Sequence, residues 1–187
     1  MKKRQMERIL NREYQEQLLG IVKDSIGSVF HLAEYPILDP PEDSPLLLKA
    51  GVFVTLKLNG NLRGCIGNIV SQKPLWRSVA EMSKASAFED YRFSPLAPEE
   101  YQNIEIEISV LSPPVEIFNF NEIEIGKHGI IISHGFNRGL FLPQVPVEQG
   151  WNLDQYLSYG CRKAGLPMDF WKKDKIQLEI FTAFVFS

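Results

Sequence analysis

Residues 51–70 read GVFVTLKLNGNLRGCIGNIV, and this stretch decides the fold of the chain around it. Its first half is rich in β-branched and aromatic residues, which favour strands. Asn59, Gly60 and Asn61 come next, and these residue types adopt the left-handed backbone conformations of a tight hairpin turn. The stretch therefore predicts a β-hairpin whose return strand begins at Leu62 and ends at about Val70.

A helix and a third strand are predicted after this hairpin. Pro74 suits the first turn of a helix, which we expect to run to about residue 88. Residues 104–110, IEIEISV, alternate apolar and polar side chains, the pattern of a strand with one buried face. We expect the isoleucines to point into the core and Glu105 and Glu107 to point away from it.

The second half of the chain shows the same order of hairpin and helix. Residues 129–133 and 139–142 predict a hairpin, and residues 153–164 predict a helix that ends at Gly165. Hairpins followed by helices, without strict strand and helix alternation, favour an α+β fold. We therefore expect mostly antiparallel sheets flanked by helices.

Three further segments complete the predicted order of elements. Apolar residues recur at helical spacing through residues 6–33, which predicts one long helix, with a break near Gly20 or Gly27 as the alternative. Residues 117–125 are strand-like. Residues 176–186 are strongly apolar and predict a single closing strand.

Length and composition favour one domain. The chain has 187 residues, of which 44% are hydrophobic, so it can bury a substantial core at the size of an ordinary domain. We expect a single domain over residues 1–187 that divides into two lobes. The larger lobe is expected at about 1–112, and a second hairpin and helix unit at about 113–187.

Charge and cysteine content disfavour several classes of function. The net charge of -3 and the pI of about 5.7 give none of the basic character typical of nucleic-acid binding. No segment reaches the length of an apolar membrane span, so we expect no membrane insertion. With only Cys65 and Cys161, a disulfide-stapled secreted scaffold is disfavoured. We expect a soluble cytoplasmic protein with two free thiols.

Within the return strand of the hairpin, Arg63, Cys65 and Gly67 lie two residues apart and are predicted to share one face. A guanidinium beside a thiol favours the thiolate, which is the nucleophilic form. Glycines at 64 and 67 weaken a strand, and close approach of a ligand or of another segment is one reason to tolerate them. The alternative is structural: a small buried thiol, an arginine paired with an acid, and glycines that mark a bulge.

Four more residues are candidates for a site. Glu107 could partner Arg63 or act as an acid or base, although polar residues on an exposed strand face are commoner. Asp90 and Arg92 lie in a turn that either carries a site or joins two elements by a salt bridge. His134 is the histidine of interest. The histidines and cysteines show no short metal-ligand spacing, and the sequence has no phosphate or dinucleotide fingerprint, so we predict neither metal nor cofactor.

The motif LRGCIG at residues 62–67 resembles the signature of the AMMECR-one domain family, known in microbes as AmmeMemoRadiSam system protein A. The resemblance covers nearly the whole chain. It includes residues 51–56, 106–113, 126–129, 139–145 and 161–166. One departure is DYRF at residues 90–93, where the family typically has Asp-Pro-Arg-Phe; both charges are kept.

This resemblance implies a two-lobed α+β fold with the signature strand near a groove. It also implies an association, through fused or clustered genes, with Memo-like proteins and a radical SAM enzyme. It assigns no catalytic residues, since the family has no established biochemical activity. The first hypothesis is a non-catalytic partner protein for these companions, with a groove near Arg63, Gly64, Ile66 and Gly67. The alternative is an enzyme that acts on a small anionic ligand, with Cys65 as nucleophile and Arg63 as anion binder. The sequence predicts no particular oligomeric state.

Overall fold

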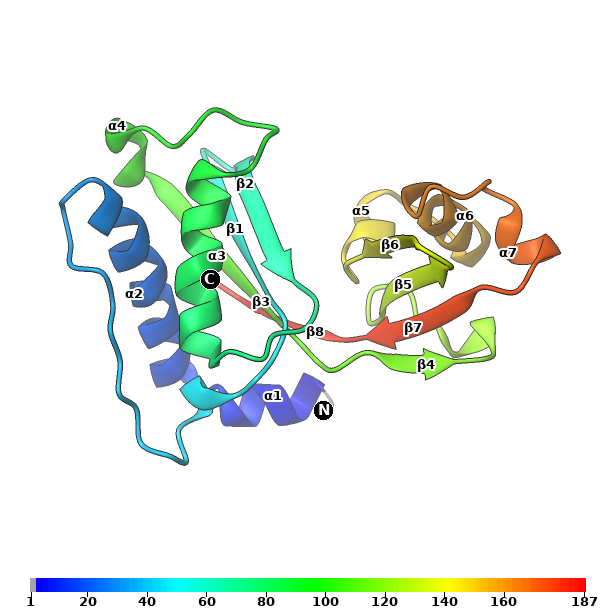
Figure 1. The fold of residues 1–187 in the computed structure, drawn as a ribbon, viewed down its shortest axis with the longest axis horizontal. Coiled ribbons are helices and arrows are strands. Elements are labelled where there is room, and N and C mark those ends of the chain that lie inside the picture. Colours follow the sequence, from blue (N-terminus) through cyan, green and yellow to red (C-terminus); the bar gives the residue numbers. More distant parts are fainter. Residues whose placement is uncertain (1–2) are drawn as a thin grey trace. The chain divides into compact units, whose positions relative to one another are not determined.

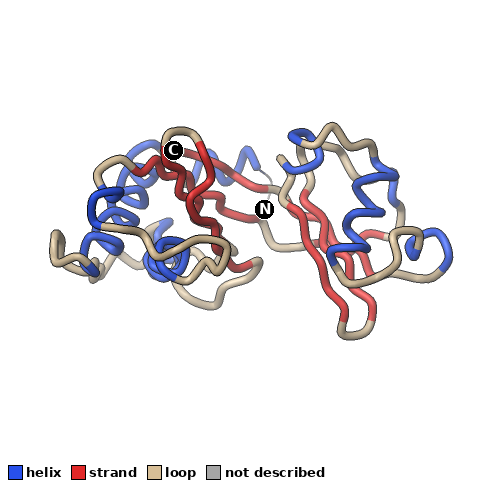
Figure 2. Tube along the Cα trace, turned by 90° about the horizontal axis from the view of Figure 1, so that it is seen from above, coloured by secondary structure: helices blue, strands red, loops and turns tan. Residues whose placement is uncertain are grey.

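The structure, a computed structural model, describes residues 3–187, which form two compact units (Figure 1). The first unit comprises the described residues up to Pro113 together with Phe184–Ser187, and the second comprises Pro114–Ala183. Each unit has a four-stranded sheet with helices on one of its faces (Figure 2). This architecture confirms the predicted α+β class with antiparallel sheets flanked by helices.

The first sheet has the strand order β2-β1-β3-β8, so that β2 lies at an edge. Its strands are β1 (Val52–Leu58), β2 (Asn61–Asn68), β3 (Ile104–Leu111) and β8 (Ala183–Phe186). Strand β1 is antiparallel to both β2 and β3. Asn59 and Gly60 adopt positive φ values of 51° and 74°, which confirms the predicted hairpin turn.

Two long helices, α2 (Arg12–Val29) and α3 (Leu75–Phe88), cover one face of this sheet and form the first core with it. Shorter elements complete the unit: α1 (Lys3–Ile9), η1 (Pro45–Leu47) and α4 (Pro98–Tyr101). Fully buried Val54 and Ile108 belong to this core, as the alternating pattern predicted for residues 104–110.

The predicted long N-terminal helix is two helices. The break falls at Asn11, whose side chain accepts a hydrogen bond from the backbone N–H of Tyr14 and so caps α2. Helix α2 continues through both Gly20 and Gly27, so the predicted break at either glycine was wrong. The Asn11 side chain bonds a backbone amide in the first turn of α2, where the amides have no partner within the helix. The spacing of apolar residues does not reveal such a cap.

The second unit has the strand order β4-β7-β5-β6, with β4 at an edge. These strands are β4 (Val115–Ile117), β5 (Gly129–His134), β6 (Asn137–Phe141) and β7 (Gln177–Phe181). Its helices are η2 (Phe120–Glu122), α5 (Val145–Glu148), α6 (Leu153–Lys163) and α7 (Phe170–Lys173). Helix α6 packs on the sheet through Tyr156 and Leu157, which are fully buried with Ile130 and Ile132 in the second core.

Two strand predictions in this half were wrong. Residues 117–125 are not a strand, because the chain leaves β4 after Ile117 and forms η2. Residues 176–186 form two strands in different sheets, since β7 pairs with β4 and β5 whereas β8 joins the first sheet. An unbroken apolar run is compatible with either arrangement, so the pattern does not show where a strand changes its partners.

None of the helices formed by residues 3–187 has the length and apolar character needed to cross a lipid bilayer.

Candidate functional site

A β-bulge interrupts the pairing of β1 with β2 at the centre of the LRGCIG motif. Leu56 pairs with Gly64 and Lys57 pairs with Leu62, so Arg63 is the extra residue without a partner on β1. A bulge re-aims the side chain of its extra residue. The strict alternation used to place Arg63 beside Cys65 therefore fails at this point.

The Arg63 guanidinium is held by the segment that follows α3. Its Nε and Nη2 atoms donate to the two carboxylate oxygens of Glu100 at 2.9 and 2.8 Å. Nη1 donates to the carbonyl of Ser94 at 2.9 Å, and Nη2 also reaches the carbonyl of Pro95 at 3.3 Å. Only 12% of the side chain is exposed. Such a bidentate pair with two carbonyl contacts leaves Arg63 little capacity for an external anion.

The backbone of Cys65 is clamped by Asp90 and Arg92. Asp90 Oδ2 accepts the Cys65 N–H at 2.9 Å, and Arg92 Nη2 donates to the Cys65 carbonyl at 3.2 Å. The two clamp residues are paired with each other, with Arg92 Nη2 2.6 Å from Asp90 Oδ2 and Arg92 Nε 2.9 Å from Oδ1. Because β2 is an edge strand, this clamp occupies backbone groups that would otherwise be open to another chain.

The clamp also changes the ionisation of its members. The pKa of Asp90 is lowered from 3.8 to about 2, chiefly by the hydrogen bond from the Arg92 side chain. The pKa of Glu100 is lowered as well, chiefly by the Arg63 side chain. Both carboxylates are therefore charged acceptors at neutral pH and do not act as proton donors there.

The Cys65 thiol is half-buried, and Thr55 on β1 donates its hydroxyl to Sγ at 3.3 Å. The pKa of Arg92 is raised, chiefly by the hydrogen bond that its side chain makes with Asp90. The guanidinium bonded to Cys65 is thus that of Arg92, through the Cys65 carbonyl, whereas sequence alternation pointed to Arg63. The bulge at Arg63 is the physical reason for this exchange of roles.

Gly64 and Gly67 are required by the close approach of other segments of this chain. A Cβ atom at Gly64 would lie 2.0 Å from the carbonyl oxygen of Ser86 in α3. At Gly67 it would lie 2.3 Å from the ring of Phe53. The Ile66 N–H donates to the Ser86 hydroxyl at 2.9 Å, and this hydroxyl donates to the Val54 carbonyl. The motif therefore fits α3 tightly against the hairpin.

The remaining predicted site residues lie apart from the clamp. Glu107 shares the row Cys65, Thr55, Glu107 across β2, β1 and β3, but its carboxylate pairs with Lys57 at 3.1 Å. His134 belongs to the second unit, where its Nδ1 lies 3.2 Å from the Lys175 carbonyl oxygen. The first unit alone thus brings together Arg63, Gly64, Cys65, Ile66, Gly67, Asp90 and Arg92.

Comparison with known proteins places this motif in a family. A family model described as AMMECR1 matches residues 13–186. The chain belongs to the AMMECR1 family.

Relatives of this AMMECR1 chain occur in bacteria and archaea. A protein of Aquifex aeolicus is 47% identical over 179 residues, covering 87% of this chain and 92% of its own. Protein NEQ441 of Nanoarchaeum equitans is 46% identical over 161 residues, covering 82% and 89%. The crystal structure of the uncharacterized protein PH0010 from Pyrococcus horikoshii is 36% identical, with a TM-score of 0.82, and covers 94% of this chain and 91% of its own.

Two residues that sequence reasoning missed complete the AMMECR1 motif here. Glu100 belongs to no sequence motif that indicates a site. It follows Pro98 and Glu99 in a segment that forms the short helix α4. Ser86 lies inside the helix predicted to run to about residue 88, and its buried hydroxyl joins β1 to β2. The small side chain at 86, beside glycines in the facing strand, was the one available signal of close helix packing.

No group of three or more His, Cys, Asp or Glu side chains is arranged to hold a metal ion within residues 3–187. The acids of the motif are instead paired with arginines, as Asp90 and Glu100 show.

Proposed function

We propose that this chain is a binding protein whose contact surface in the first unit is formed by Cys65, Tyr91 and Arg92, here called the Cys65 surface. The observation that carries this proposal is the commitment of Arg63 and Asp90 to internal bonds. These charged groups of the motif build a rigid edge strand. They do not form a set of free acid, base and nucleophile, which an active site would need.

The side chains left accessible on this edge are of the types that dominate protein interfaces. Tyr91 is 94% exposed, and the Arg92 side chain is 43% exposed while its geometry is fixed by Asp90 and the Cys65 carbonyl. Tyrosine and arginine are enriched among residues whose truncation costs most binding energy, and a preorganised arginine loses less freedom on binding.

The partners that we propose are the Memo-like protein and the radical SAM enzyme that accompany this family. A binding role explains why an almost fully exposed tyrosine follows the buried Asp90 directly. The clamp holds Tyr91 outward from a turn that is fixed at both neighbours, because Asp90 and Arg92 are bonded to each other and to β2.

The experiment is a calorimetric titration of the full chain with each companion protein from the same genome. Tyr91→Ala is expected to weaken the complex about tenfold, a typical effect for an interface hot spot. Ile37→Ala is the matched control, since Ile37 is a large hydrophobic residue of the first unit that is 85% exposed outside the motif. Absence of binding to both companions, or equal losses in the two variants, contradicts the proposal.

A second candidate function is catalysis by the Cys65 thiol on a small anionic substrate. The specific observation in its favour is the neighbourhood of Cys65, where the Thr55 hydroxyl donates to Sγ and the Arg92 guanidinium donates to the Cys65 carbonyl. In this version Arg92 takes the role of anion binder that sequence alternation gave to Arg63. Of the three histidines only His31 belongs to the same unit as the thiol, and no hydrogen bond joins it to Cys65 within the described residues, so this candidate lacks an assigned base.

Alkylation with a charged and a neutral reagent tests this second candidate. An anion site at Arg92 is expected to raise the rate of iodoacetate relative to iodoacetamide at Cys65, by severalfold compared with the same ratio for glutathione. Arg92→Gln is expected to abolish the difference. A ratio equal to that of glutathione in the unmodified protein removes the anion-binding part of this function.

A further inference from the structure

The second unit contains a cavity of about 450 Å³, within the size range of small-molecule sites. It lies where β4 stops beside β7. Its lining includes Phe118, Phe120 and Ile176, together with the polar residues Ser133, His134 and Gln177. All of these residues belong to the second unit, and the cavity has no part in the Cys65 surface.

The backbone of Ile176 faces this cavity with both of its polar groups. Gln177 pairs with Ser133 of β5, and Leu178 pairs with Ile117, the last residue of β4. The Lys175 carbonyl oxygen lies on the β5 side, where His134 Nδ1 is 3.2 Å away. Since the N–H and C=O groups of successive strand residues point to opposite sides, those of Ile176 point to the β4 side.

Strand β4 no longer covers that side. The chain turns away after Ile117 and forms η2, so the position opposite Ile176 has no strand residue. Within residues 3–187, neither backbone group of Ile176 takes part in a hydrogen bond. A donor and an acceptor of one residue are therefore presented side by side to the cavity.

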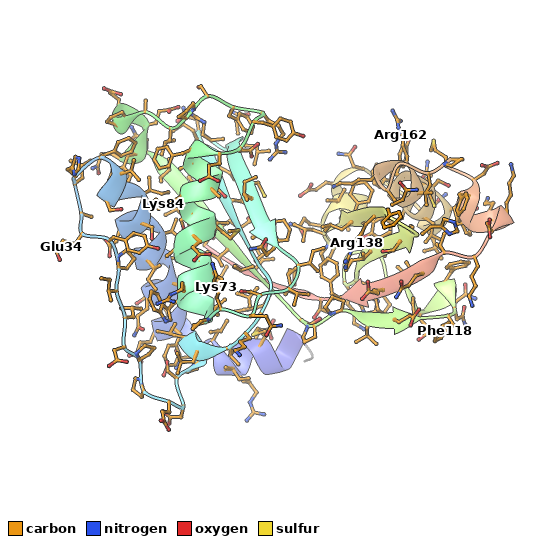
Figure 3. The ribbon with its side chains drawn as sticks, in the orientation of Figure 1. Glu34, Lys73, Lys84, Phe118, Arg138 and Arg162 are labelled. Atoms are coloured by element: carbon orange, nitrogen blue, oxygen red, sulfur yellow. The ribbon has the colours of Figure 1, made fainter. Side chains whose placement is uncertain are left out.

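Aromatic rings line the same cavity. Phe118 follows β4 directly and is 84% exposed, so its ring is available to a ligand (Figure 3). Phe120 is fixed by an edge-to-face contact with Trp171, with ring centroids 5.3 Å apart. Exposed and fixed aromatic faces favour stacking of a planar group.

We infer that this cavity binds a small planar molecule that carries an amide N–H and C=O on one edge, such as an aromatic carboxamide or a lactam heterocycle. The amide edge pairs with the N–H and C=O of Ile176, and the ring stacks on Phe118. The His134 contact to Lys175 requires a proton on Nδ1, because a carbonyl oxygen only accepts, so neutral His134 offers Nε2 as a further acceptor.

NMR titration of the full chain with benzamide tests this site. Benzamide is expected to bind in the millimolar range and to shift the amide signals of Ile176 and Gln177. N,N-dimethylbenzamide keeps the ring and the carbonyl but lacks the N–H donors, and it is expected to bind at least tenfold more weakly. A capped alanine dipeptide supplies the same backbone chemistry without a ring, and it is expected to bind more weakly than benzamide.

Two phenylalanine variants provide the matched comparison. Phe118→Ala removes a ring that lines the cavity and is expected to weaken benzamide binding about fivefold. Phe136→Ala removes a fully exposed ring of the same unit that is not part of the lining, and it is expected to leave the affinity unchanged. Equal affinity for the two benzamides, equal effects of the two variants, or tighter binding of the dipeptide would each overturn the inference.

Discussion

The edges of the two sheets differ in how their backbone groups are covered. In the first unit the edge strand β2 is closed by side chains from the segment after α3, with Asp90 and Arg92 bonded to Cys65 and Arg63 bonded to Glu100. In the second unit the edge strand β4 has only three residues and leaves Ile176, the residue before β7, uncovered. One edge is thus closed by bonds within its own unit, and the other borders a cavity of ligand size.

This difference teaches that a family motif can be conspicuous in sequence because it solves a packing problem. The residues of LRGCIG and the acids that bind them satisfy one another almost completely. By contrast, the cavity of the second unit is lined by residues that form no recognisable motif. The following predictions test the closed edge against the open one, from the largest expected effect to the smallest.

Gly64→Ala is expected to lower the free energy of unfolding by about 3 kcal/mol, because overpacking forces α3 and β2 apart. The new Cβ would lie 2.0 Å from a backbone atom, the Ser86 carbonyl oxygen, which cannot move aside as a flexible side chain could. Chemical denaturation measures the change. Gly20→Ala in α2 is the control, since a Cβ there meets no atom within 4 Å, and it is expected to stabilise the protein by about 0.5 to 1 kcal/mol.

Asp90→Ala is expected to lower the free energy of unfolding by about 2 to 3 kcal/mol, because it leaves the Cys65 N–H and the Arg92 guanidinium without their acceptor. The side chain of Asp90 is 2% exposed, so water replaces it poorly. Denaturation at pH 7 measures the loss. Asp154→Ala, which breaks an exposed pair with Lys172, is expected to change stability by less than about 1 kcal/mol; equal losses in both variants contradict a closed edge.

Acid should weaken the closed edge over a defined range of pH. The folded pKa of Asp90, about 2, lies below its unfolded value, so its contribution is complete above about pH 4 and is lost as the pH falls to about 2. Between pH 6 and pH 2 the original protein is expected to lose about 2 kcal/mol more than Asp90→Asn. Parallel pH dependence of the two proteins in urea denaturation would mean that the carboxylate has an ordinary pKa.

Hydrogen exchange distinguishes the two edges without any substitution. The Cys65 amide donates to buried Asp90, whereas the Ile176 amide has no acceptor within the described residues. After correction for intrinsic rates, the Ile176 amide is expected to exchange about tenfold faster or more. Exchange at equal rates would show that both edges are covered to the same degree in solution.

Local pattern was sufficient for much of the fold. The turn at Asn59 and Gly60, the alternation of residues 104–110 and the end of α6 near Gly165 depend on neighbours in sequence, and the structure has them where the pattern indicated. The change of sheet between β7 and β8 depends on distant partners, so the apolar run of residues 176–186 could not reveal it.

In the candidate site too, local pattern indicated which residues matter, whereas their partners depend on contacts distant in sequence. Sequence singled out Arg63, Cys65, Asp90 and Arg92, and these residues do lie together. The structural alternative already held an arginine paired with an acid and glycines that mark a bulge, but the sequence did not show that Arg63 is the extra residue or that Glu100 is its partner. Glu100 and Ser86 act through contacts 37 and 20 residues away in sequence, beyond the range of any spacing rule.

The position of β8 has a consequence for synthesis on the ribosome. This strand belongs to the first sheet, yet it is translated after the whole second unit. At ordinary elongation rates, the roughly 70 residues that separate Pro113 from Phe184 take about 4 to 14 s to be made. During that interval the nascent first sheet has β3 as an open edge, and this edge is closed only when β8 has been made and pairs with β3.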